Sequence, residues 1–165
     1  MSKKGQLFSM DLVVSLVAFS VVLLFLFGMW NLYSVRLNEN IASADLSLTA
    51  FQVTDTLIKS KGFPSTWEND LNNISTIGLN SYPGALDQNK VNTFLTMDYN
   101  YTKEIFNIER MDFQFRIFDS YGNEVNSIGI APTDDASESI TITRIILIDG
   151  TKRKILFTLW RTYNG

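Results

Sequence analysis

A run of 19 uncharged residues from Leu12 to Trp30 constrains this chain more than any other feature. Its only polar side chains are those of Ser15 and Ser20. A helix of that length rises about 28 Å, close to the ~30 Å thickness of the hydrocarbon core of a bilayer. A single segment crosses lipid as a helix, because each backbone polar group must find its partner within the segment. The run therefore predicts a membrane-spanning helix near the start of the chain.

The charges around this run predict its orientation. Lys3 and Lys4 precede it, and the nearest acid, Asp11, lies at its edge. Positive flanks favour the cytoplasmic side, so we expect residues 37–165 to lie outside the cell. A cleaved secretory signal and a plain signal anchor are two interpretations of this region. The first is disfavoured, because the run exceeds the usual apolar length of about 7–15 residues and no small-residue cleavage site follows it.

The residues before the run allow a third interpretation. They read Lys3-Lys4-Gly5-Gln6-Leu7-Phe8-Ser9-Met10-Asp11-Leu12, which resembles the class III signal peptide of archaeal type IV pilins. The resemblance implies that a prepilin peptidase cuts between Gly5 and Gln6 and that the apolar helix is retained. Lys3 and Lys4 would form the basic leader. Asp11 would stand for the acidic residue of the mature helix, although the family usually has a glutamate one residue nearer the cut.

Asp11 has two roles that its position allows. A carboxylate in the first turn of a helix gains about 0.3–1 kcal/mol from the helix dipole. Alternatively, it could neutralise the new α-amine of Gln6 on a neighbouring subunit, since a charge at the apolar boundary is costly unless it is paired. The two roles are compatible with each other.

One face of the predicted helix is a candidate for assembly with other pilin subunits. Its members are apolar and recur at steps of three or four, and they are Phe8, Leu12, Leu16, Phe19, Leu23, Leu26 and Trp30. The alternative is that these side chains contact lipid alone.

Composition narrows the function classes. The chain has no cysteine, so the outer domain must rely on packing, and no histidine, which removes the commonest general base and zinc ligand. A net charge of −3, with no basic stripe beyond Lys152-Arg153-Lys154, argues against nucleic-acid binding. The segment Asp119–Glu124 does not match a calcium-binding loop. We expect a non-enzymatic protein with no cofactor, metal site or catalytic residues.

The helical pattern is expected to continue past the membrane run to about Ser60. Gly62 suits a C-terminal cap, and Pro64 prevents further helix. Leu37–Asn40, which contains two asparagines, is where we expect any break. The whole helix is expected to run from about Leu7 to Ser60. Its second half is expected to bury one apolar stripe against a globular domain, and the stripe comprises Ile41, Ala44, Leu48, Phe51 and Ile58.

The segment 61–90 is rich in Asn, Ser, Gly and Pro and predicts a long ordered loop. Gly62–Glu68 and the following Ile77-Gly78-Leu79 also resemble a segment of archaeal pilin-like proteins. Trp67 is expected to hold this loop against the helix. Asp87 and Asp98 are expected to cap two short helices.

Alternating apolar and polar residues predict strands over 111–117, 124–130, 140–148 and 154–163, with residues 131–138 as a surface loop. Asp149-Gly150 is a strong hairpin signal. We therefore predict an α+β fold in which a long N-terminal helix packs on a small antiparallel sheet of about four strands, as in type IV pilins. The expected division is a leader (1–5), a transmembrane and filament-core helix (6–36), its amphipathic continuation (37–60) and an extracellular globular domain (61–165).

Two N-x-[ST] sequons, at Asn73 and Asn100, are candidate glycosylation sites on a domain outside the cell. Together these features favour a subunit, major or minor, of an archaeal type IV pilus-like filament on the cell surface. Its partners would be the prepilin peptidase, membrane lipid before assembly and other pilin subunits, and would include no nucleic acid. The alternative is an unprocessed, membrane-tethered extracellular domain that serves in binding or adhesion.

Overall fold

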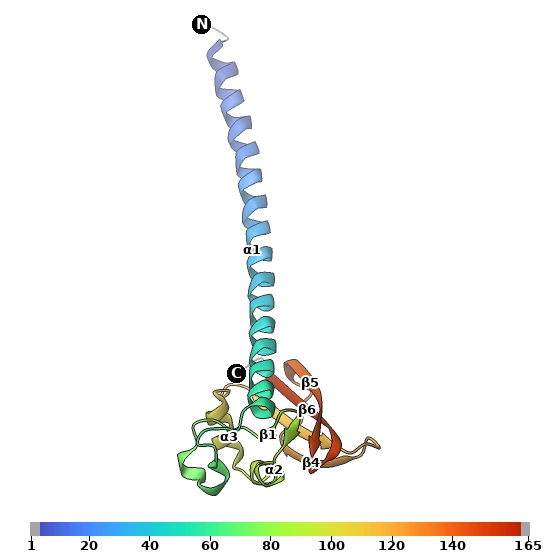
Figure 1. Cartoon of the computed structure of the whole chain (residues 1–165). Coiled ribbons are helices and arrows are strands. Elements are labelled where there is room, and N and C mark those ends of the chain that lie inside the picture. Colours follow the sequence, from blue (N-terminus) through green and yellow to red (C-terminus); the bar gives the residue numbers. More distant parts are fainter. Residues whose placement is uncertain (1–3, 163–165) are drawn as a thin grey trace. The chain divides into compact units, whose positions relative to one another are not determined.

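The computed structural model describes the backbone of residues 4–162, and Lys3 lies outside the described residues. The fold is α+β, with a long apolar N-terminal helix followed by a curled, mixed β-sheet (Figure 1). The chain divides into two compact units, Met1–Ala42 and Ser43–Gly165.

Helix α1 spans Lys4–Lys59. It agrees with the predicted helix to within one turn at each end, and it continues through residues 37–40, so the break expected there is not found. At its end, the N–H of Ser60 still donates to the carbonyl oxygen of Thr56 at 3.0 Å. Gly62 has a φ of 79°, which glycine adopts without strain, and the chain then leaves the helical path.

The stripe that α1 buries in the second unit differs from the predicted one. Leu48 and Phe51 are 57% and 47% exposed, and Ile41 and Ala44 are exposed as well, whereas Ile58 is half-buried. The buried stripe instead consists of Leu46, Ala50, Val53 and Leu57. Both sets have helical spacing, so periodicity alone could not choose between them. The buried set contains Ala50, whose small side chain allows a close approach of the helix to the rest of the domain.

The segment after α1 is ordered around Trp67, as expected. It contains two short 3₁₀ helices, η1 (Trp67–Asn69) and η2 (Leu71–Asn73). The Trp67 side chain is fully buried, and its Nε1–H donates to the carbonyl oxygen of Gly78 at 2.9 Å. A side chain at Gly62 would collide with the Trp67 ring, so this glycine is required by packing as well as by backbone conformation.

Helices α2 (Gln88–Leu95) and α3 (Tyr99–Phe106) confirm the two predicted caps. The Asp87 carboxylate accepts from the N–H groups of Asn89 and Lys90, and the Asp98 carboxylate accepts from the N–H of Tyr101. Each cap pairs a backbone donor that would otherwise lack a partner in the first turn.

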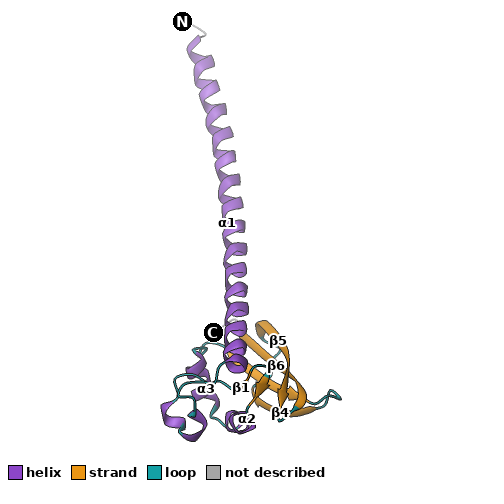
Figure 2. Cartoon of the chain, in the orientation of Figure 1, coloured by secondary structure: helices purple, strands orange, loops and turns teal. Residues whose placement is uncertain are grey.

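The sheet has six strands in the order β1-β2-β5-β6-β3-β4. Figure 2 shows the strands in orange. The predicted strands correspond to β3 (Asp112–Phe118), β4 (Glu124–Gly129), β5 (Ala136–Ile148) and β6 (Thr151–Thr162), which pair antiparallel. The turn between β5 and β6 is the predicted one, with positive φ at both Asp149 and Gly150.

Three details of the predicted sheet are wrong. Strands β1 (Asn80–Tyr82) and β2 (Ala85–Leu86) lie in the predicted loop 61–90 and raise the number of strands to six. Strand β2 runs parallel to β5, so the sheet is mixed rather than antiparallel. Strand β5 begins at Ala136, inside the predicted loop 131–138. Segments of two or three residues are too short to show an alternating pattern, which explains why sequence reasoning missed β1 and β2.

Aromatic side chains dominate the core of the second unit. Phe113 of β3 stacks on Phe157 of β6 with ring centroids 5.8 Å apart, and Phe106 meets both rings edge-on. Phe94 of α2 contacts Phe115 edge-on at 5.3 Å. These contacts attach the two short helices to one face of the sheet.

Candidate functional site

Residues Met10–Leu37 of α1 form one candidate functional region. Its most apolar 18-residue stretch has a mean hydropathy of 2.8, and none of the segment is buried within the structure. By length and composition it can cross a membrane, and it is the sole segment with that property in the part of the chain that the structure describes. The structure is therefore compatible with a single-pass membrane protein.

The predicted assembly face, apart from Phe8, lies within this segment, and none of its described members is buried. Its described members, Leu12, Leu16, Phe19, Leu23, Leu26 and Trp30, are between 37% and 73% exposed. Phe8 belongs to the same face, but its side chain lies outside the described residues. Val14, Val21 and Phe25, on other sides of the helix, are exposed as well. A single chain thus leaves this segment apolar on all sides, as lipid or neighbouring helices require.

The predicted processing residues lie at the start of α1. The backbone of Lys4, Gly5 and Gln6 is helical, and their side chains lie outside the described residues. One expectation for Asp11 is corrected. Because α1 begins at Lys4, its first turn contains no acidic residue, and Asp11 lies in the second turn, where the interaction with the helix dipole has fallen off.

The two sequons differ in their surroundings. Asn73 is exposed at the end of η2, and Ser75 is also exposed. Asn100 is exposed in the first turn of α3, but Thr102 is fully buried and its hydroxyl donates to the carbonyl oxygen of Asp98 at 2.8 Å. The first sequon is therefore accessible in the folded domain, whereas the hydroxyl of the second is not.

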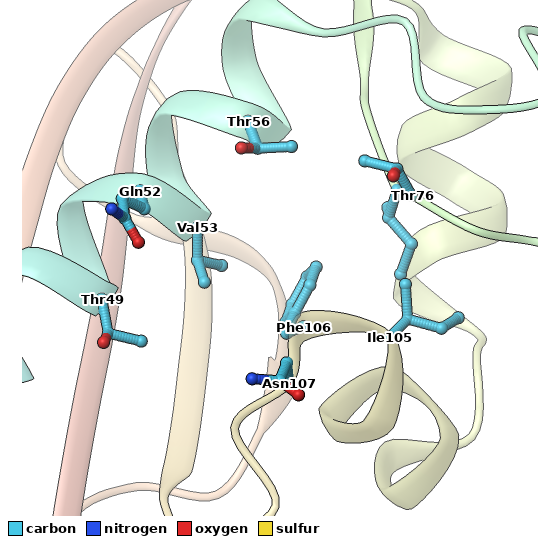
Figure 3. A pocket seen from close by; sticks show the side chains of 9 residues that line it. Thr49, Gln52, Val53, Thr56, Thr76, Ile105, Phe106 and Asn107 are labelled. Atoms are coloured by element: carbon cyan, nitrogen blue, oxygen red, sulfur yellow. The ribbon is translucent and has the colours of Figure 1, made fainter.

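A groove in the second unit is a further candidate (Figure 3). It has a volume of about 290 Å³. Side chains from α1 face side chains from the end of α3 and from the segment before β1, as Figure 3 shows. The polar lining residues are Thr49, Gln52, Thr56, Thr76 and Asn107, and the apolar ones are Val53, Ile77, Ile105 and Phe106.

The lining of this groove is neutral. None of its polar side chains makes a hydrogen bond within the described structure, whereas the nearby Thr54 hydroxyl donates to the carbonyl oxygen of Ala50 at 2.7 Å. The lining can donate and accept hydrogen bonds, but it provides no acid or base for proton transfer. Sequence analysis missed the groove. The sequence pattern that corresponds to the groove is three uncharged polar residues on one side of α1, Thr49, Gln52 and Thr56, at steps of three and four. The sequence does not show which residues lie opposite them.

One cluster of titratable groups lies between α3 and β3. The Asp112 carboxylate accepts from the hydroxyl of Tyr99 at 2.7 Å and from Nζ of Lys103 at 2.8 Å. Burial by itself would raise the pKa of Asp112, but hydrogen bonds from Lys103 and Tyr99 outweigh it and hold the pKa below its usual value. Burial and the neighbouring carboxylate raise the pKa of Tyr99. Tyr99 and Lys103 both donate their hydrogen bonds to the Asp112 carboxylate, so the three side chains pair with one another, which indicates a structural role.

No protein-family model, curated protein or solved structure matches this chain.

Proposed function

We propose that this protein is a structural subunit of an archaeal type IV pilus-like surface filament, anchored in the membrane through α1 before assembly. One observation carries the proposal. The segment Lys3-Lys4-Gly5-Gln6 lies shortly before the uncharged run Leu12–Trp30, which is helical, apolar on every side and buried by nothing in its own chain. A surface of that kind needs lipid or neighbouring helices around it.

The topology follows from the charges. Lys3 and Lys4 hold the N-terminus in the cytoplasm, and the unit Ser43–Gly165 is displayed outside the cell. That unit has its own core of strands and short helices, so it can fold after it crosses the membrane.

Assembly exchanges lipid contacts for contacts between helices. Burial of apolar surface is worth about 25 cal/mol per Å² when water is displaced, but lipid is as apolar as a helix surface, so the exchange is nearly balanced. Close packing of the face that contains Leu16, Leu23 and Trp30 would have to favour the filament. The basic leader would be removed between Gly5 and Gln6 first, because two lysines at the end of the helix oppose entry into an apolar bundle.

Substitution of Gly5 tests the proposal. In the native host, Gly5→Trp should block the cut, keep the leader on the protein and abolish its recovery in surface material removed by shearing. Gly28→Ala is the matched control. A Cβ at Gly28 meets no atom within 4 Å, and Gly28 lies away from the proposed assembly face, so this variant should be cut normally.

The unprocessed, membrane-tethered domain makes the opposite prediction. If the wild-type protein retains Met1–Gly5 in native membranes and Gly5→Trp has no effect on its surface display, the filament proposal is wrong. The tethered domain then accounts for the apolar segment, since an anchor in lipid needs no cut.

A further inference from the structure

Strand β5 has a long edge without a neighbour. β6 pairs with β5 along the whole strand on one side. On the other side, β2 pairs only with Leu147 and Ile148. Residues 136–146 therefore leave one edge of β5 without a strand partner in the described structure.

The hydrogen bond to β2 identifies the backbone groups on this edge. The N–H of Leu147 donates to the carbonyl oxygen of Gly84 at 3.0 Å, so the backbone of Leu147 points away from β6. Alternate residues of a strand point their backbone groups the same way. Ser139, Thr141, Thr143 and Ile145 therefore present their N–H and C=O groups at the free edge.

This edge has little of the protection that free strand edges usually carry. Proteins block such edges with proline, lysine, bulges or very short strands. Residues 137–146 contain no proline and no lysine, and the irregularity in the pairing of β5 lies at its start, between Ala136 and Glu138. The segment is rich in isoleucine and threonine, and its only charged residues are Glu138 and Arg144. An edge of this kind is a template for another strand.

We infer that the free edge of β5 pairs with the same edge of a second copy of this chain, antiparallel and around a two-fold axis at Thr141. In this register Thr141 lies opposite its own copy, and Ser139 lies opposite Thr143. All of these residues have backbone groups that face the edge, so they form the hydrogen-bonded pairs of an antiparallel ladder. The inference is independent of the proposed filament assembly.

The charges of β5 select this register. With the axis at Thr141, Glu138 of one copy lies opposite Arg144 of the other, and this pair occurs twice. An axis at Ile140 or Ile142 would instead place Glu138 opposite an isoleucine. Residues that lie directly opposite each other share a face of the sheet, and opposite charges there stabilise the pairing.

The partners of these charges within each chain support the same arrangement. Glu138 accepts from Arg161 at 2.7 Å, and Arg144 lies 3.5 Å from the Asp55 carboxylate. In the paired sheet, Arg161 and Glu138 of one copy would continue into Arg144 and Asp55 of the second copy. The row alternates in sign, so each inner charge gains a second opposite neighbour.

Cysteine cross-linking tests the register, because the chain has no cysteine of its own. Glu138→Cys and Arg144→Cys are prepared as separate full-length variants in detergent micelles, where no shared bilayer restricts how two copies meet. Oxidation of the mixture should give a disulfide-linked dimer, since this non-hydrogen-bonded pair brings the two Cα atoms to about 4.5 Å. Neither variant alone should cross-link. Tyr121→Cys is the control for disulfides that form by random collision, because Tyr121 is 90% exposed and lies in the turn between β3 and β4, away from the proposed interface.

A proline variant tests the hydrogen bonds. Thr141→Pro removes an N–H that faces the edge and leaves the bonds to β6 in place, whereas Thr141→Val keeps that N–H. Sedimentation of the full chain should show a monomer–dimer equilibrium that Thr141→Pro weakens at least tenfold and Thr141→Val leaves nearly unchanged. Circular dichroism confirms that both variants are folded.

Three results would overturn the inference. They are a wild-type chain that stays monomeric up to about 100 µM, a dimer equally stable in the Thr141→Pro and Thr141→Val variants, or a dimer in which the mixed Glu138→Cys and Arg144→Cys variants do not cross-link. The last two results would assign the association to α1 or to another strand edge.

Discussion

The two halves of α1 contain similar apolar residues but differ in what surrounds them. Between Leu12 and Trp30 the helix is apolar on every side, and none of its residues is buried within the chain. Between Ser43 and Lys59, one stripe, including Leu46 and Leu57, is buried in the core, while Leu48 remains exposed. The comparison teaches that hydrophobicity alone does not define a core. The second half is partly buried in the core of its own chain, whereas the first half leaves its apolar surface unburied and is long and apolar enough to cross a membrane.

Removal of a core ring should show the largest effect. Phe157→Ala deletes a fully buried side chain that contacts Phe113 and Phe106, and should lower the free energy of unfolding by about 3–5 kcal/mol. Phe25→Ala is the same substitution in the membrane half and should leave that free energy unchanged, because Phe25 is 68% exposed. Chemical denaturation of the full chain in detergent, followed by tryptophan fluorescence, measures both. Equal effects would remove the distinction between the two halves.

Next in size is a pair of substitutions within the second half of α1. Leu57→Ala should cost about 2–5 kcal/mol, because this side chain is fully buried. Leu48→Ala should cost no more than about 0.5 kcal/mol, since Leu48 is 57% exposed. The same denaturation experiment compares them, and a larger loss for Leu48→Ala would mean that the stripe predicted from sequence is the buried one.

This pair also shows where sequence reasoning reaches its limit. Apolar spacing located the helix and its end near Lys59, and local chemistry at Asp87, Asp98 and Asp149-Gly150 predicted two caps and a hairpin. The stripe predicted on α1 was wrong, because which stripe is buried depends on core side chains from segments distant in sequence.

The sheet and the groove show the same limit. β2 is two residues long and is defined by its pairing with β1 and β5, so no local pattern marks it. The groove is lined by Gln52 of α1 and by Asn107, which is distant from it in sequence. Both depend on tertiary contacts, whereas the apolar segment of α1 is a local property and was visible in the sequence.

A charge in the membrane half should act on insertion rather than on folding. Leu24→Lys places a cation near the middle of the apolar segment and should oppose membrane insertion by about 2.5–3.5 kcal/mol. Leu48→Lys introduces the same charge at an exposed position of the second half and should leave insertion intact. The fraction of protein that resists alkaline extraction from membranes measures the difference. Full retention of Leu24→Lys would argue against a spanning role for this segment.

The smallest expected effect is a pH dependence confined to the second unit. The folded-state pKa of Asp112 lies below its unfolded value, so its contribution is complete above the unfolded pKa of about 3.9 and is lost as the pH falls through the folded pKa. Asp112→Asn should flatten the loss of stability in this acidic range. Denaturation curves recorded between about pH 2 and pH 6 test this. An unchanged slope would show that other carboxylates carry the acid sensitivity.

The intact mass of the protein isolated from native membranes or surface fibres tests the central claim most directly. The account predicts a chain that begins at Gln6 and still contains Met10–Leu37, with any glycan as an added mass at Asn73 or Asn100. A native protein that has lost residues 10–37 would contradict it, because the apolar half of α1 would then be a discarded signal rather than the anchor and assembly helix.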